Sequence, residues 1–208
     1  MKNNIVLALT KGRILRESLP LLADAGVEPA EPIDGTRKLL LATNHEDIKL
    51  AILRGADVPT YVKYGAADLG IVGKDVLLEY GSEGLYEAAD LGIACCRLMT
   101  AGIPNRVPNV GTLRVATKFV NITRDYFGKK GKQIDIVKLY GALELAPLMD
   151  LADVIVDLVD TGDTLRANGL IPFEEILPIS SRLIVNKASI RQKTSFLLPF
   201  IDSLAKLN

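Results

Sequence analysis

Residues 154–165 read VIVDLVDTGDTL, and this segment constrains the fold of the chain more than any other. A run of apolar, β-branched residues ends in Asp160-Thr161-Gly162-Asp163-Thr164, and helix-compatible residues follow from Leu165. This order predicts a strand, a tight turn and the start of a helix. Backbone N–H groups and two threonine hydroxyls would then surround one concave point, which suits a phosphate.

Two carboxylates, Asp157 and Asp160, stand beside this predicted turn. Side chains alternate along a strand, so we expect Asp157 to face the ligand side while Asp160 begins the turn. A cradle for phosphate alone has no use for acids, so the pair indicates a ligand with both a phosphate and sugar hydroxyls. The alternative is a purely structural turn in which Asp160 caps the helix.

Strand candidates alternate with helical stretches along the whole chain, which is typical of an α/β fold. The expected strands are residues 5–10, 39–43, 50–53, 69–72, 94–100, 113–117, 134–139, 154–159, 174–180 and 181–186. The expected helices are residues 14–25, 58–64, 75–80 and 120–127, a short one within 142–150, and a closing one at 188–207. We expect Pro199 to kink or split the closing helix, because proline removes a helical hydrogen bond.

Composition narrows the function classes. The 208 residues are 49% hydrophobic and 24% charged with a net charge of zero, so nucleic-acid or anionic-membrane binding has little support. The apolar stretch from Ile5 to Leu9 is too short for a signal-peptide core, and no run approaches the roughly 20 apolar residues of a membrane span. We therefore expect a cytoplasmic protein.

Cysteine and histidine offer little chemistry. Cys95 and Cys96 are adjacent, and we interpret them as two small buried residues of a core strand, the alternative being a vicinal disulfide or redox pair. His45 is the one histidine of the sequence and lies in a polar segment. A histidine metal site or a catalytic triad is therefore not expected.

Several cations stand at predicted strand ends, where α/β sheets bind their ligands. They are Lys11 and Arg13 in Thr10-Lys11-Gly12-Arg13, then Arg37-Lys38, and Arg54. Taken singly, each is as readily an ordinary surface cation, but together they would neutralise a pyrophosphate. Asp75 in Gly73-Lys74-Asp75 and Glu144 are weaker candidates, and Asp75 has the alternative role of a helix cap.

Longer segments carry a family resemblance. The chain resembles the ATP phosphoribosyltransferases in ALTKGRI, in RKL, in ILRGADVPTYVKYGAADLGIVGKDVL and above all in ELAPLMDLADVIVDLVDTGDTL. Its length is similar to that of the short form, which lacks a C-terminal regulatory domain. Two positions depart from the family pattern: Thr10 stands where serine is usual, and Asp150 where glycine is usual. Asp163 adds a further carboxylate beside the phosphate turn and would have to point outward.

The resemblance implies an α/β, two-lobe fold similar to type II periplasmic binding proteins, with the active site in the inter-lobe cleft. One lobe would combine residues 1–92 and 183–208, and residues 93–182 would form the other. Crossings near Arg97–Ala101 and Arg182–Asn186 would act as hinges.

The family reaction joins N1 of the ATP adenine to C1 of phosphoribosyl pyrophosphate, releases pyrophosphate and begins histidine biosynthesis. By resemblance, Arg13 and Arg37 would be catalytic. Phosphoribosyl pyrophosphate would be bound by Lys11, Glu144, Asp157, Asp160, Thr161, Gly162, Asp163 and Thr164, and ATP by Arg13, Arg54 and Asp75. Mg²⁺ would be the cofactor, carried by the substrate pyrophosphate and not by a protein site.

The resemblance also implies a regulatory partner similar to histidyl-tRNA synthetase in a hetero-octamer, and a homodimer of the chain alone. Two other hypotheses stay open. A solute-binding module shares the implied fold, and another phosphoribosyltransferase would use a different base.

Overall fold

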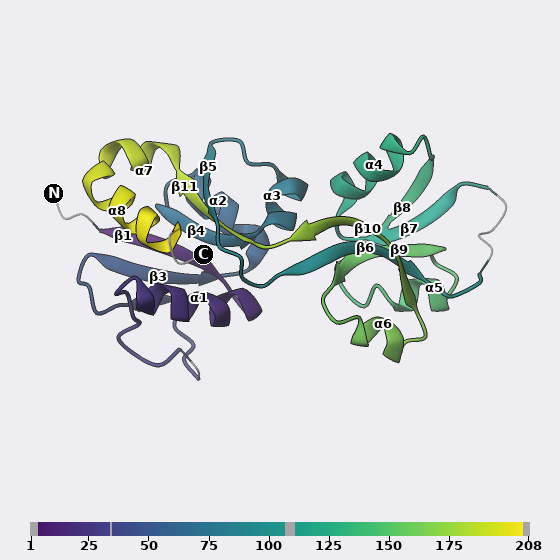
Figure 1. The fold of residues 1–208 in the computed structure, drawn as a ribbon, viewed down its shortest axis with the longest axis horizontal. Coiled ribbons are helices and arrows are strands. Elements are labelled where there is room, and N and C mark those ends of the chain that lie inside the picture. The colour runs from purple at the N-terminus through teal and green to yellow at the C-terminus, as the bar shows by residue number, and fades with distance from the viewer. Residues whose placement is uncertain (1–3, 34, 107–110, 206–208) are drawn as a thin grey trace. The chain divides into compact units, whose positions relative to one another are not determined.

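Two β-sheets, each covered by helices, make up the computed structural model, which describes residues 4–33, 35–106 and 111–205 (Figure 1). The chain divides into unit 1, residues 1–94 with 180–208, and unit 2, residues 95–179. It passes between them at Ala94–Cys95 and at Ile179–Ser180. The expected crossing segments, Arg97–Ala101 and Arg182–Asn186, lie instead inside strands, where sheet pairing holds them.

Unit 1 holds a six-stranded sheet in the order β2-β3-β1-β4-β11-β5. Strands β1, β3 and β4 are parallel, whereas β2, β11 and β5 each run antiparallel to a neighbour. Its elements are β1 (Ile5–Thr10), α1 (Arg13–Asp24), β2 (Leu40–Ala42), β3 (Ile48–Leu53), the 3₁₀ helix η1 (Gly55–Asp57), α2 (Val58–Lys63), β4 (Leu69–Gly73), α3 (Lys74–Tyr80), β5 (Leu85–Asp90), β11 (Ser181–Asn186), α7 (Lys187–Gln192) and α8 (Thr194–Ala205).

The two faces of this sheet bury different helices. Leu15 and Leu22 of α1 share one apolar cluster with Leu197 of α8. Val58 of α2 and Leu77 of α3 lie in another cluster with Ala8 and Ile184. Both faces are covered, which explains why the central parallel strands β1 and β4 read as nearly continuous apolar runs.

Unit 2 holds a five-stranded sheet in the order β10-β6-β9-β7-β8. Strands β7, β8 and β9 are parallel, and β6 runs antiparallel to both β9 and β10. Its elements are β6 (Cys96–Gly102), β7 (Leu113–Thr117), α4 (Val120–Lys129), β8 (Ile134–Lys138), α5 (Leu145–Leu148), β9 (Val154–Val159), α6 (Asp163–Ala167) and β10 (Ile171–Ile179).

Most of the predicted elements are confirmed, and residues 5–10, 113–117 and 181–186 form strands with the expected bounds. Strand β5 was not predicted. The closing segment is split, but Pro199 lies inside α8 and the break falls at Lys193, so the expected position of the break was wrong. Residues 206 and 207 of the expected helix lie outside the described residues.

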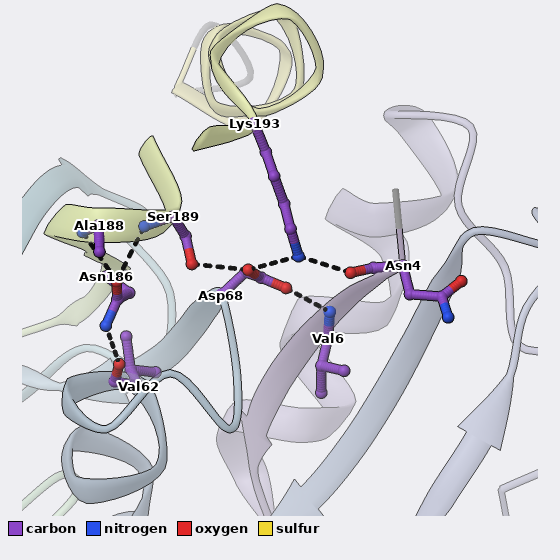
Figure 2. A network of polar contacts seen from close by, with 8 residues as sticks. All are labelled: Asn4, Val6, Val62, Asp68, Asn186, Ala188, Ser189 and Lys193. Carbon is purple, nitrogen blue, oxygen red and sulfur yellow. Dashed lines mark hydrogen bonds and ion pairs between the residues drawn. The ribbon is translucent and has the colours of Figure 1, made fainter. Parts of the chain in front are cut away.

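Lys193, where the helix breaks, belongs to a polar network around Asp68 (Figure 2). The Lys193 ammonium donates to the Asp68 carboxylate at 2.8 Å and to the Asn4 carbonyl at 2.6 Å. The same carboxylate accepts hydrogen bonds from the Ser189 hydroxyl and from the Val6 N–H. The C-terminal helices are thereby fastened to the start of β1 and to the residue before β4, at the amino end of the parallel strands.

No helix among the described residues has the length and apolar character needed to cross a membrane.

Candidate functional site

The side chain of Asp157, in strand β9, lies on one face of the unit 2 sheet. Ile155 and Val159 lie in the apolar cluster that also contains Ala146 of α5 and Leu165 of α6, whereas Val156 packs in the cluster on the other face. Because side chains alternate along a strand, Asp157 shares the face of Ile155 and Val159. A pocket of about 290 Å³ opens there, lined by Asp157, Glu144 and the whole 160–164 turn.

The turn after β9 brings the predicted phosphate-turn residues together. Gly162 has φ 78° and is the N-terminal cap of α6, so the left-handed backbone explains the glycine. The alternative in which Asp160 caps the helix is wrong, because the cap lies two residues later. Asp160 begins the turn and lines the pocket with Asp157, as expected.

Arg166, in the last turn of α6, hydrogen-bonds back to this turn. Its guanidinium donates to the Thr161 carbonyl at 3.0 Å and forms an ion pair with the Asp163 carboxylate. The Thr161 hydroxyl also donates to Asp163, at 2.6 Å. These hydrogen bonds, Thr161 first and then Arg166, lower the pKa of Asp163. The Asp163 side chain is 75% exposed, and Thr161 and Arg166 of the turn and helix balance its charge.

Asp157 is the most perturbed group of this pocket. Its side chain is 24% exposed, and its Oδ1 atom is shielded from solvent yet accepts no hydrogen bond from the described residues. Burial raises the pKa of Asp157; the nearby Lys118 ammonium opposes this rise and the Glu144 carboxylate adds to it. The Lys118 ammonium lies 3.5 Å from Oδ1, longer than an ordinary hydrogen bond, so this carboxylate can still accept hydrogen bonds from a ligand in the pocket.

Glu144 and Lys118 complete the pocket surroundings. Glu144 is half-buried at the start of α5, within reach of the pocket. Lys118 follows β7 directly, and its Nζ lies 3.5 Å from Asp157 Oδ1. Our sequence reasoning missed Lys118. Its position directly after a strand could have identified it, because β7 and β9 are parallel neighbours whose carboxyl ends meet at one edge of the sheet.

Unit 1 gathers the predicted cations at the carboxyl edge of its parallel strands. Thr10 of β1 pairs with Leu53 of β3, so Lys11 and Arg54 follow neighbouring strands at the same edge. The Lys11 N–H donates to the Leu53 carbonyl at 2.8 Å. Arg13 begins α1 directly after Gly12, whose φ of 99° permits the sharp turn out of β1. Lys11, Arg13 and Arg54 are all exposed.

Arg37 reaches the same edge from a different direction. It lies in the loop before β2, and the Ile52 N–H donates to the Leu39 carbonyl, so that the antiparallel register carries residue 37 toward the end of β3. Arg37 is exposed, and the neighbouring Lys38 forms a surface ion pair with Glu31 at 2.8 Å. The structure thus brings the four cations to one end of the sheet, as the pattern of strand ends predicted.

Asp75 lies in the first turn of α3, beyond the carboxyl end of β4, and is buried. Its carboxylate folds back over Gly73: a Cβ on that glycine would lie 2.2 Å from Asp75 Oδ1. The alternative of Asp75 as a cap is not borne out, since the cap is Gly73 and no side-chain hydrogen bond closes it. The missing side chain of Gly73 is what gives the carboxylate its room.

The other residues singled out in the sequence, Thr10, Asp150, the two cysteines and His45, lie outside the pocket of unit 2. The Thr10 hydroxyl donates to the Ile71 carbonyl at 2.9 Å and ties β1 to β4. Asp150 has φ 56°, which gives a physical reason for the glycine usual at this position. Cys95 is exposed and Cys96 is half-buried, so the prediction of two buried cysteines was wrong. A ring nitrogen of His45 contacts the Gly26 carbonyl at 2.9 Å.

Comparisons with known proteins agree with these observations. The family model described as HisG, ATP phosphoribosyltransferase, matches residues 54–206. The ATP phosphoribosyltransferase of Halorhodospira halophila is 60% identical over 205 residues, covering 99% of this chain and 96% of that protein. The enzyme of Chromohalobacter salexigens is 59% identical over 206 residues, covering 99% of this chain and 95% of its own.

A solved structure extends the likeness to the fold. The ATP phosphoribosyl transferase (HisG:HisZ) complex from Thermotoga maritima contains a chain with a TM-score of 0.82 and 35% identity, over 97% of both chains. This match confirms the expected α/β fold of the periplasmic-binding-protein-like type. The chain therefore belongs to the ATP phosphoribosyltransferase family of transferases, whose reaction is the first step of histidine biosynthesis.

Proposed function

We propose that the two units divide the substrates of this reaction between them. The unit 2 pocket would hold the ribose 5-phosphate part of phosphoribosyl pyrophosphate, with Asp157 and Glu144 accepting hydrogen bonds from the ribose hydroxyls. The turn of Asp160, Thr161, Gly162, Asp163 and Thr164 would hold the 5-phosphate. The observation that carries this assignment is the pocket itself, in which the carboxylates of Asp157 and Glu144 lie beside the turn of residues 160–164.

The cations of unit 1 would serve the phosphates. Lys11, Arg13, Arg37 and Arg54 would face the pyrophosphate of the donor and the phosphates of ATP, with Asp75 near the nucleotide. Their position at the carboxyl ends of parallel strands, where α/β proteins bind ligands, supports this role.

The reaction requires that the protein position the two substrates and stabilise the charges of the transition state. Adenine N1 attacks C1 with its own lone pair, the C1–O bond breaks, and pyrophosphate leaves with the bonding electrons. In the transition state, positive charge develops on the ribose, next to the Asp157 carboxylate, and negative charge on the leaving group; the new C1–N1 bond then moves the positive charge to the adenine, which loses a proton from its amino group to solvent. Fixed cations that stabilise the leaving group are therefore the expected catalysts, with Arg13 and Arg37 first among them.

Mg²⁺ is proposed as a companion of the substrate. No three His, Cys, Asp or Glu side chains gather to hold a metal ion in residues 4–33, 35–106 and 111–205. Magnesium commonly binds through substrate phosphates with few protein ligands. Bound to the pyrophosphate, it would neutralise part of the leaving-group charge, and no protein side chain named here is required to hold it.

We also propose a regulatory partner. The Thermotoga maritima structure is a complex of two kinds of chain, HisG and HisZ. By analogy, this chain would work in the cytoplasm with a subunit similar to histidyl-tRNA synthetase in a hetero-octamer, and would form a homodimer alone. Co-purification from the source organism, followed by mass measurement of the assembly, tests this: a mass with no second kind of chain contradicts it.

The reaction is tested by measuring pyrophosphate release from phosphoribosyl pyrophosphate, with ATP and with other nucleotides in parallel. We expect release that depends on ATP. Release with another base in place of ATP would indicate a different phosphoribosyltransferase. Binding without turnover, in the presence of a competent partner subunit, would indicate a solute-binding module.

A further inference from the structure

Glu17 makes two contacts that the proposed reaction does not yet explain. Its Oε1 accepts a hydrogen bond from Arg13 Nε at 2.6 Å, one turn earlier on α1. Its Oε2 accepts a hydrogen bond from the Ala94 N–H at 2.7 Å. One carboxylate thus joins a proposed catalytic cation to a backbone group 77 positions away in the sequence.

Helix stability does not account for the Arg13–Glu17 pair. Both side chains are substantially exposed, and exposed ion pairs contribute little. An arginine in the first turn also meets the positive end of the helix dipole, which disfavours a cation. The pair has arginine N-terminal to glutamate, the less favourable order for an i,i+4 contact. These effects all disfavour Arg13 at this position, so its pair with Glu17 is better explained by a role in the site than by helix stability.

Ala94 occupies a special position in the chain. It is the last residue of the first stretch of unit 1, and the chain passes into unit 2 at the next residue. Its φ is 51°, in the left-handed region that residues other than glycine rarely adopt. Such backbone persists where surrounding contacts hold it, and the hydrogen bond from Ala94 to Glu17 is one of these contacts. The Ser181 N–H donates to the neighbouring Ile93 carbonyl, so the returning chain is fastened beside it.

We propose that Glu17 is a positioning residue, which orients the Arg13 guanidinium and ties it to the segment through which the chain leaves unit 1. This inference rests on the proposed role of Arg13. The Ala94 N–H and the Arg13 side chain both donate to the carboxylate, and these contacts lower the pKa of Glu17, with the Ala94 hydrogen bond as the larger cause. The group therefore stays ionised, as a fixed partner for a guanidinium must.

The test combines Glu17→Gln, Arg13→Ala and the double variant, assayed with ATP and phosphoribosyl pyrophosphate in the assembly that gives full activity. The amide oxygen of Glu17→Gln can still accept from Ala94 but carries no charge for Arg13. We expect kcat to fall roughly tenfold with KM for the donor nearly unchanged, because a misplaced catalytic group costs rate. In the Arg13→Ala background, the same substitution should change kcat by less than about twofold.

Two further variants separate structure from positioning. Glu83→Gln removes a carboxylate that is 94% exposed and pairs with Lys63 at 3.5 Å, so it serves as the control, with unchanged kcat. Glu83→Gln should unfold at the wild-type temperature, and Glu17→Gln slightly below it, because a lowered pKa means that the ionised Glu17 stabilises the fold. Glu17→Ala, which also removes the acceptor for Ala94, should lower kcat further than Glu17→Gln.

The outcomes are distinct. A wild-type kcat for Glu17→Gln, or losses that multiply in the double variant, overturns the positioning role while leaving the proposed function intact. Equal kcat for Glu17→Ala and Glu17→Gln overturns the tie to Ala94. A wild-type kcat for Arg13→Ala overturns both this inference and the proposed role of Arg13.

Discussion

The ammonium of Lys118 lies 3.5 Å from the Oδ1 atom of Asp157, across the carboxyl ends of the parallel strands β7 and β9. The lysine partly offsets the burial of the carboxylate, whereas the nearby Glu144 adds a like charge. The net effect of these surroundings is a raised pKa for Asp157. The pocket therefore holds a carboxylate whose ionisation the folded chain disfavours.

Asp157→Asn should separate activity from stability. We expect kcat/KM for phosphoribosyl pyrophosphate to fall about 10- to 100-fold, because a hydrogen bond to a charged group contributes about 1.5–3 kcal/mol. A raised native pKa means that the ionised form weakens folding. This penalty is absent below the pKa of aspartate in the unfolded chain and grows as the pH rises through the native value. The variant should therefore melt higher than the wild type at pH 7.

Thermal melts across pH check this expectation. The advantage of Asp157→Asn should shrink as the pH falls. Asp135→Asn, the same substitution at an exposed position of β8 in the same sheet, should change neither the melting temperature nor the activity. A variant at position 157 that is less stable than the wild type at pH 7 would contradict the argument.

Arg37→Ala should lower kcat much more than it weakens substrate binding. If the guanidinium stabilises the leaving pyrophosphate, its loss costs about 10²–10³ in rate, or roughly 3–4 kcal/mol. Steady-state kinetics with both substrates measures the split between kcat and KM. Lys38→Ala removes the adjacent cation, which pairs with Glu31, and should leave kcat unchanged. Equal losses in binding and rate for Arg37→Ala would mean a positioning role instead.

Gly73→Ala should disturb the nucleotide side of the site. The added Cβ would lie 2.2 Å from Asp75 Oδ1, so the buried carboxylate must move. We expect a loss of about 1–3 kcal/mol in the free energy of unfolding, together with a higher KM for ATP. The matched control is Gly128→Ala in α4, where a Cβ would meet nothing within 4 Å. It should stabilise by about 0.5–1 kcal/mol, and urea unfolding of both variants gives the comparison.

Asp150 offers a test of backbone conformation with no effect on the reaction. Its φ is 56°, its side chain pairs with Arg106, and its carbonyl accepts from Arg114 at 2.8 Å. In Asp150→Gly, relief of backbone strain offsets the lost surface pair, so stability should change by less than about 0.5 kcal/mol. Asp150→Ala loses the pair without the relief and should be about 1 kcal/mol less stable than the glycine variant. Equal stability of the two variants in urea would remove the conformational explanation.

The sequence predicted best those elements whose signal is local. The strand at 5–10 is nearly all apolar, and the strand at 181–186 has an apolar centre, Leu183–Val185; both are largely buried, so their residues alone mark them. The turn at 160–164 carries its own glycine and hydroxyls. For the same reason, the amino-acid sequence alone is enough to locate the pocket formed by Asp157 and this turn.

What escaped prediction depends on distant partners. Strand β5 reads LYEAAD, a mixed pattern that becomes a strand because β11 pairs with it. Lys193, at the helix break, contacts Asp68 and Asn4, which are far away in the sequence. Lys118 contacts Asp157 and Glu17 contacts Ala94, and no local sequence pattern predicts either contact.

The place of β11 between β4 and β5 also affects how the protein is made. Unit 1 combines two stretches of chain separated by the whole of unit 2, which is continuous. On the ribosome, β5 must wait for residues 181–186 before it gains its neighbour in the sheet, whereas the five strands of unit 2 have all emerged by then. The unit whose first residues are synthesised earliest is therefore the last to complete its sheet.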